Sequence, residues 1–143
     1  FVLRVISDRH LMAEKWFPPT PLRILLDGEM KNMTNQLTKK EIDQKTENCH
    51  QDLSSLPKDF LKSLLKEAKI LCMPKAKHYK DKFIKDMEAS LENDINRLEG
   101  LRLKNPTISR TDIEILRKNK NSLKSTMEKA GLSLDSLRII VNK

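Results

Sequence analysis

The longest helical pattern in the sequence runs from Lys75 to Lys104 without a proline. Apolar side chains recur along it at spacings of three and four residues: Ala76, Tyr79, Phe83, Met87, Leu91, Ile95, Leu98 and Leu101. At 1.5 Å per residue, about thirty helical residues measure roughly 45 Å, which exceeds the width of a small domain. A helix of this length needs a partner along its apolar stripe, so this segment constrains the fold more than any other.

A second amphipathic helix is predicted immediately after the first. The Asn-Pro pair at 105–106 ends the long helix, and the Thr-Asp-Ile-Glu stretch at 111–114 matches a capping box that begins the next one. Gly131 is expected to cap its C-terminus. Its apolar stripe consists of Ile113, Leu116, Leu123, Met127 and Ala130. A short loop between two such helices predicts an antiparallel helical hairpin over residues 75–130.

Two further helices are predicted before the hairpin. One begins after Pro57, and Pro74 ends or kinks it, with the hairpin helix starting there. Its apolar stripe comprises Phe60, Leu61, Leu64, Leu65, Ala68, Leu71 and Cys72. The other is a short helix within 38–47, where Thr38 and Glu41 form a capping box in front of a thin apolar face.

Three strands are predicted, two at the start of the chain and one at its end. Residues 1–7 and 22–26 are rich in apolar and β-branched side chains, and 137–141 alternates in the same way. The Asp-Gly pair at 27–28 is a turn signal. Ahead of the second strand lie three prolines, which fix φ near −65° and remove backbone donors, so this stretch is interpreted as a rigid, extended lead-in to the sheet: Pro18, Pro19 and Pro21.

These elements together predict an α+β fold. A long antiparallel helical hairpin and a further helix would pack with a small antiparallel sheet built from the N-terminal strands and the C-terminal strand. A chain of 143 residues is expected to form one domain with a single core. Because the sequence begins inside an apolar stretch, we expect a fragment whose N-terminal strand is truncated, taken from a larger protein.

The net charge of +8 lies mainly on the predicted helices. Residues 56–90 contain nine basic and five acidic residues, and residues 101–143 contain ten basic and four acidic residues. Two groups of lysines form the candidate docking or nucleic-acid surface: Lys62, Lys66 and Lys69, and Lys118, Lys120 and Lys124. A solvated helix surface is the favoured interpretation of such lysines. The six aromatic residues fall mostly at stripe positions, and Trp16 is interpreted as a core residue, so stacking on bases is disfavoured.

No motif for chemistry is present in the sequence. Phosphate-binding glycine loops, a nucleophile elbow and a zinc-protease helix are all lacking, so no catalytic or cofactor-binding residue is assigned. The acidic residues near the predicted N-terminal strands are attributed to turn formation and solubility.

The only cluster of potential metal ligands is Cys49, His50, Cys72 and His78. Its spacing fits no zinc pattern, so no metal site is assigned and both cysteines are expected to be free thiols. No apolar run approaches the length of a membrane span, so no membrane contact is expected.

Three stretches carry a family likeness: FPPTPLRILLDG at 17–28, RLEGLRLKNPTI at 97–108 and GLSLDSLRIIV at 131–141. In this order they resemble the C-terminal domain of the RapA family, bacterial RNA polymerase-associated ATPases of the Swi/Snf type. No catalytic role attaches to the matching residues, which are taken as structural: Pro18, Pro19, Pro21, Arg23, Asp27, Arg97, Glu99, Asn105, Pro106, Asp135 and Arg138.

The resemblance implies a function for a larger parent protein. That parent would be an ATP-dependent, helicase-like protein of the bacterial cytoplasm that binds the RNA polymerase core and promotes its recycling. ATP and magnesium would bind a part of the parent that lies outside this sequence, and so would the motifs for nucleic acid. The sequence is therefore expected to be a non-catalytic docking or regulatory domain over 1–143, with DNA or RNA binding by the basic faces of the hairpin as the alternative.

Overall fold

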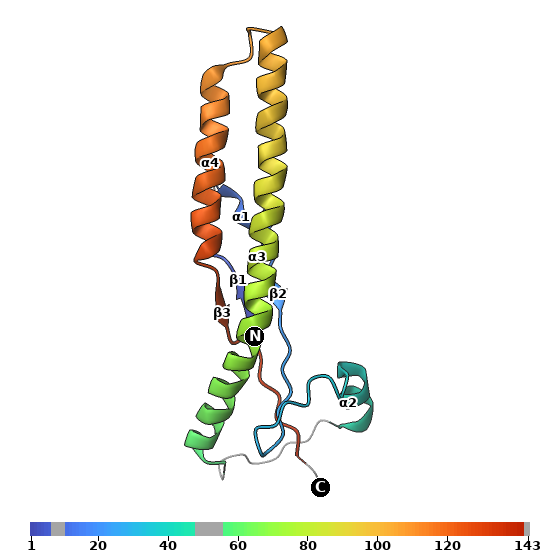
Figure 1. The fold of residues 1–143 in the computed structure, drawn as a ribbon. Helices are drawn as coiled ribbons and strands as arrows, with labels where there is room; N and C mark the ends of the chain where they lie inside the picture. The colour runs from blue at the N-terminus through green and yellow to red at the C-terminus, as the bar shows by residue number, and fades with distance from the viewer. Residues whose placement is uncertain (7–10, 48–55, 142–143) are drawn as a thin grey trace.

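The structure, a computed structural model, describes residues 1–6, 11–47 and 56–141. In chain order its elements are β1 (Val2–Arg4), α1 (Ala13–Trp16), β2 (Thr20–Pro21), α2 (Lys39–Lys45), α3 (Lys58–Lys104), α4 (Arg110–Glu128) and β3 (Gly131–Ser133). Figure 1 shows α3 and α4 side by side as a long arm, with the small sheet at its base and α2 beyond the sheet. The predicted α+β class is confirmed.

The predicted helical hairpin is present and consists of α3 and α4. Asn105 ends α3, and its side-chain Oδ1 accepts a hydrogen bond from the Thr107 N–H at 3.1 Å. The start of α4 differs from the prediction, because the N-cap is Ser109, whose Oγ accepts from the Thr111 N–H at 3.1 Å. The capping box assigned to 111–114 is therefore wrong, and the helix begins earlier.

Apolar side chains from both helices are buried along the seam of the hairpin. They are Met87, Leu91 and Ile95 from α3, with Ile113, Leu123 and Met127 from α4. The predicted stripe extends further than the buried seam, since Leu98 is only half-buried and Leu101 is 45% exposed. The two helices are thus packed tightly near the base and less closely at the tip.

Pro74 lies inside α3 and does not end it. The sequence predicts that Pro74 ends or kinks one helix and that a second helix starts there; the separate start is wrong, because α3 continues through Pro74. A proline inside a helix removes one N–H donor and crowds the carbonyl one turn earlier, which bends the axis. Figure 1 shows the first turns of α3 inclined to the long upper part of the helix, as the kink predicted at Pro74 requires.

The sheet has the strand order β2-β1-β3, with β1 antiparallel to both neighbours. The strand predicted at 22–26 is wrong: β2 is Thr20–Pro21, within the proline-rich stretch. This is allowed because β2 lies at an edge, where the N–H that Pro21 lacks needs no partner. Only Leu22 extends the pairing, donating its N–H to the Phe1 carbonyl at 2.7 Å.

The C-terminal strand also lies elsewhere than predicted. Residues 137–141 form no strand, whereas β3 starts at Gly131, which is therefore a strand residue and not a helix cap. Lys129 occupies the C-cap of α4 instead. Because β1 already pairs on both sides, the strongly apolar segment after β3 has no inner strand to join.

The core lies between the sheet and the lower half of the hairpin. Phe17 is fully buried, and its ring meets Phe83 of α3 edge-on with centroids 5.1 Å apart. Tyr79 stacks on the same Phe83 ring at 6.0 Å. Trp16 is only partly buried against this cluster, so Phe17, which directly follows the unpredicted helix α1, is the main aromatic anchor.

Candidate docking surface

An apolar groove of about 290 Å³ lies at the base of the molecule, below the sheet. We call it the basal groove. Three segments line it: residues 24–28, the first turns of α3 with Phe60 and Leu64, and the C-terminal segment 137–141. Of the predicted apolar stripe in these turns of α3, only Cys72 is buried, and the remaining residues are half-buried. The described part of this chain therefore covers the stripe incompletely.

The position of α4 explains why the groove is open. Lys80 donates a hydrogen bond from Nζ to the carbonyl oxygen of Glu128, the last residue of α4, at 3.1 Å. The turns of α3 before Lys80 therefore extend past the end of α4. Beyond the sheet, the described segments that pack against them are loops, and several large apolar side chains are exposed: Ile70, Met73, Leu137, Ile140 and Val141.

The C-terminal segment is fixed by Arg138, one of the residues in the family motif. Its guanidinium pairs with Asp43 of α2 at 2.5 Å and donates to the Thr46 hydroxyl. Leu137, beside it, remains 55% exposed. Asp135 is also exposed. The motif thus attaches this segment to α2 while its apolar side chains face the basal groove and solvent.

The motif residues near the N-terminus stabilise the loops around the groove. Arg23 donates two hydrogen bonds to the Leu37 carbonyl, both at 2.9 Å. Asp27 closes the turn predicted at this position, because its Oδ1 accepts from the N–H groups of Glu29 and Lys31 at 2.9 and 2.8 Å. Among the prolines, Pro18 accepts a hydrogen bond from the Thr20 hydroxyl, whereas Pro19 and Pro21 are exposed.

The motif residues of the hairpin lie toward its tip. Arg97 pairs with Asp94 at 3.6 Å on the surface of α3, and Pro106 follows the end of that helix. Glu99 pairs across the hairpin with Arg117 at 2.5 Å. Each motif residue with a described side-chain contact therefore contacts another part of this chain, and the structural role of the motif residues stays a prediction.

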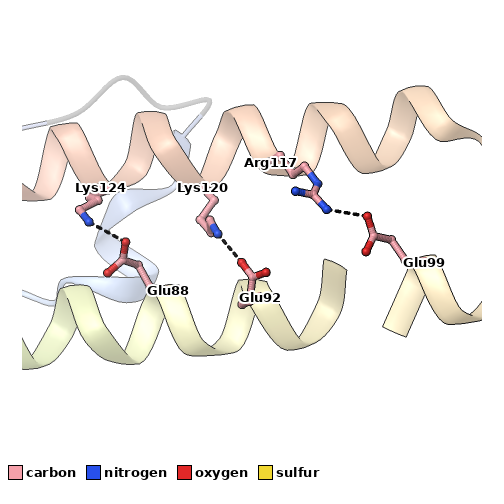
Figure 2. A network of polar contacts seen from close by, with 6 residues as sticks. All are labelled: Glu88, Glu92, Glu99, Arg117, Lys120 and Lys124. Atoms are coloured by element: carbon pink, nitrogen blue, oxygen red, sulfur yellow. Dashed lines mark hydrogen bonds and ion pairs between the residues drawn. The ribbon is translucent and has the colours of Figure 1, made fainter. Parts of the chain in front are cut away.

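Three ion pairs cross the hairpin along one flank, shown in Figure 2, and we call them the ladder: Glu88–Lys124, Glu92–Lys120 and Glu99–Arg117. Glu88 and Lys124 are 2.8 Å apart. The hydrogen bond from Lys120 lowers the pKa of Glu92, and the hydrogen bond to Glu88 raises the pKa of Lys124. The sequence signal for such pairs is a set of glutamates spaced by four and seven residues on α3 that matches basic residues spaced by four and three on α4 in antiparallel order, and the sequence analysis did not predict these pairs.

The ladder changes the interpretation of the second lysine group. Lys120 and Lys124 each have a carboxylate partner, whereas Lys118 is exposed without an ion pair in the described part of the chain. In the first group, Lys62 pairs with Asp59 at 3.2 Å, and Lys66 and Lys69 are exposed. Whether either group contacts nucleic acid stays a prediction, but half of these charges are neutralised locally.

Replacing Glu92 by glutamine is expected to flatten the acid limb of the stability profile. Because the folded pKa of Glu92 is lowered, its pair with Lys120 stabilises the fold above the unfolded pKa, and this contribution disappears as pH falls through the folded pKa. The pKa of Lys124 is raised in the folded state, so its pair with Glu88 has the opposite pH dependence. This pair stabilises the fold below the unfolded pKa of the lysine, and the stabilisation is lost as pH rises through the folded pKa.

The measurement is the melting temperature between pH 7 and about pH 3, where carboxylates titrate. The variant should lose less melting temperature on acidification than the unchanged protein. Asp59→Asn is the control, because it removes an almost fully exposed carboxylate from a pair within one helix. Equal slopes for the unchanged protein and the Glu92 variant would contradict the stabilising role of the ladder.

The residues weighed as metal ligands are not brought together by the described structure. Cys49 and His50 lie outside the described residues, Cys72 is buried in the core, and His78 is exposed with its ring edge-on to Tyr79 at 5.9 Å. Burial raises the pKa of the Cys72 thiol. Within residues 1–6, 11–47 and 56–141, no group of three His, Cys, Asp or Glu side chains is placed to bind a metal. The free state of Cys49 stays a prediction.

No helix in the described ranges combines the length and the apolar character that crossing a bilayer requires.

Comparison with known proteins gives a consistent result. Residues 1–142 match the RNA polymerase recycling family C-terminal domain. The chain is 25% identical over 145 residues to the RNA polymerase-associated protein RapA of Yersinia pestis (strain Pestoides F), and equally to that of Yersinia pseudotuberculosis (serotype O:1b, strain IP 31758). Each match covers 99% of this chain but 15% of the relative, so the chain spans about one seventh of the length of these relatives.

Proposed function

The chain belongs to the RNA polymerase recycling family as its C-terminal domain, and from this premise we propose that it is a non-catalytic docking module of an RNA polymerase-associated protein. The parent would use ATP and magnesium, bound outside this chain, to promote recycling of RNA polymerase in the bacterial cytoplasm. This chain would dock on the rest of the parent and position it relative to the polymerase core.

The basal groove is the observation that supports this proposal most directly. Large exposed apolar patches usually mark an interaction surface, and here the apolar side chains of α3 and of the C-terminal segment surround one cavity. Since the chain spans 15% of the length of its relatives, the proposed parent would supply a much larger protein body to cover the groove. Interfaces between domains of one chain commonly bury about 600–1,500 Å², so the groove would form only part of such an interface.

Nucleic-acid binding by the two lysine groups is the weaker candidate. Three of the lysines already have carboxylate partners: Lys62, Lys120 and Lys124. Binding phosphate through them would break these ion pairs. The docking proposal requires no such exchange. It needs only burial of side chains that the described structure leaves exposed.

The substitution Leu137→Asp tests the docking proposal. The probe is the parent protein with the segment corresponding to this chain deleted, and the measurement is its affinity for the separate 143-residue chain. Because the leucine side chain is 55% exposed, the fold should tolerate the aspartate. In the docked state the same charge would be buried without a partner, so affinity should fall by about tenfold or more.

Ile115→Asp is the matched control, because this side chain on α4 is 49% exposed and lies outside the basal groove. Its affinity should equal that of the unchanged chain. Equal affinities for all three proteins would refute docking through the groove, and failure of the unchanged chain to bind would refute docking on the parent.

A further inference from the structure

A second pocket, of about 540 Å³, lies where the chain leaves β2 and passes the kink of α3. We call it the Pro74 pocket. It is separate from the basal groove, and its walls come from residues 21–23, from Thr34 and from the α3 turns around Pro74. The motif arginine and the helix kink therefore meet at one surface site.

The polar groups that line the pocket are suited to an anion. Arg23 and Lys75 supply two positive charges, and His78 adds an imidazole that can donate a hydrogen bond. None of the residues that line it is acidic. Lys82 continues the same face of α3, one helical repeat of seven residues after Lys75. Neither lysine has an ion-pair partner within residues 1–6, 11–47 and 56–141, in contrast to the lysines of the ladder.

Two of the donors are positioned before any ligand arrives. Arg23 uses two of its N–H groups on the Leu37 carbonyl, at 2.9 Å each, which fixes the guanidinium and leaves three donors. Thr34 accepts from the Leu25 N–H at 3.0 Å through Oγ1, so its hydroxyl proton remains to be donated. Fixed donors lose less conformational entropy on binding than free side chains.

The remaining wall is aromatic and equally fixed. The ring of Tyr79 stacks on Phe83 at 6.0 Å, Phe83 in turn contacts the buried Phe17, and His78 lies edge-on to Tyr79. A half-buried ring beside basic groups is the combination that single-stranded nucleic-acid sites use, because phosphates meet the charges and bases stack on the ring.

We propose that the Pro74 pocket binds a phosphate group of single-stranded nucleic acid. Arg23 and Lys75 contact the phosphate oxygens, Thr34 donates its hydroxyl, and Tyr79 with His78 packs against the neighbouring base. Duplex DNA or RNA fits less well, since its bases are stacked on each other and cannot reach the ring. The proposal does not depend on the docking role of the basal groove.

The test uses the 143-residue chain with two probes, inorganic phosphate and a fluorescent oligothymidylate of about ten nucleotides. Lys75→Gln combined with His78→Gln changes two exposed side chains and should leave the amide spectrum of the core unchanged. Its oligonucleotide affinity should fall about tenfold, and the slope of affinity against salt should decrease by about one. Lys66→Gln combined with Lys69→Gln, on exposed positions outside the pocket, should behave as the unchanged chain.

Amide chemical shifts locate the contact. Oligonucleotide-induced changes at 21–23, 34 and 74–79 support the proposal, provided that the pocket variant abolishes them. Changes centred elsewhere, an equal loss of affinity in the lysine control, or no binding at low salt would overturn it. If inorganic phosphate shifts the same amides and the oligonucleotide binds no more tightly than phosphate, the pocket accepts the free anion, and the assignment to nucleic acid is wrong.

Discussion

Phe17→Ala is expected to lower the free energy of unfolding by about 3–5 kcal/mol, a large part of the roughly 5–15 kcal/mol typical of a domain. Phe17 is fully buried between the sheet and α3, and its ring meets Phe83 edge-on at 5.1 Å. Removing it leaves a cavity that the short strands on one side and a rigid helix on the other cannot fill by collapsing. The melting temperature should fall by about 10–15 °C.

Phe17→Leu is the matched variant, because it keeps most of the buried volume and loses only the aromatic edge contact. We expect a loss of about 1 kcal/mol for it, the size of an aromatic pair beyond its area. Met12→Ala, at a side chain that is 66% exposed, should have little effect. Thermal or urea unfolding of all three separates these cases, and equal stabilities for Phe17→Ala and Met12→Ala would show that this ring does not anchor the core.

Ile95→Asp is expected to cost about 3–5 kcal/mol, because it places a charge without a partner inside the hairpin seam. Ile95 is fully buried, yet it lies outside the main cluster formed with the sheet. Figure 1 shows that, among the described residues, the arm above α1 consists of α3 and α4, so no other described element can supply a compensating group. The upper part of the hairpin should separate while the base remains folded.

Amide hydrogen exchange distinguishes such local opening from global unfolding. Protection should be lost first in the α3 and α4 residues above Ile95, and later around Met87 and Met127, which are fully buried in the main cluster. Leu103→Asp, at a side chain that is 90% exposed near the tip, is the control and should change stability by less than about 0.5 kcal/mol. Unchanged protection in the Ile95 variant would mean that the seam assignment is wrong.

The sequence alone was sufficient to predict the helical hairpin, because a helix is defined by contacts between residues close in the chain. The spacing of Met87, Leu91 and Ile95 identifies the buried face, and the Asn-Pro pair at 105–106 marks the end of α3. The capping box of Thr38 and Glu41 is local in the same sense, and the structure confirms it. Errors at helix ends, such as Ser109 in place of Thr111, are differences of a residue or two between competing local caps.

Strand positions were decided by tertiary structure, because pairing depends on which distant segment is adjacent. Pro21 is compatible with a strand only at a sheet edge, and the sequence does not state which strand is at the edge. Residues 137–141 have a stronger strand pattern than Gly131–Ser133, but the latter follow α4 directly beside β1. The closeness of Gly131–Ser133 to β1 therefore decided the position of the strand, against the stronger intrinsic strand preference of residues 137–141.

The candidate surfaces depend on the tertiary structure for the same reason. The apolar stripe of Phe60 and Leu64 has the pattern of a buried helix face, and only the end of α4 near Lys80 shows that this face extends past its partner. Likewise, Lys75 and Lys124 look alike in sequence, but a carboxylate from the neighbouring helix neutralises the second. Burial and charge neutralisation depend on pairs of segments that are distant in the sequence. The residue pattern along one segment therefore determines which secondary structure that segment can form, and the packing of the whole fold determines which of its side chains stay exposed.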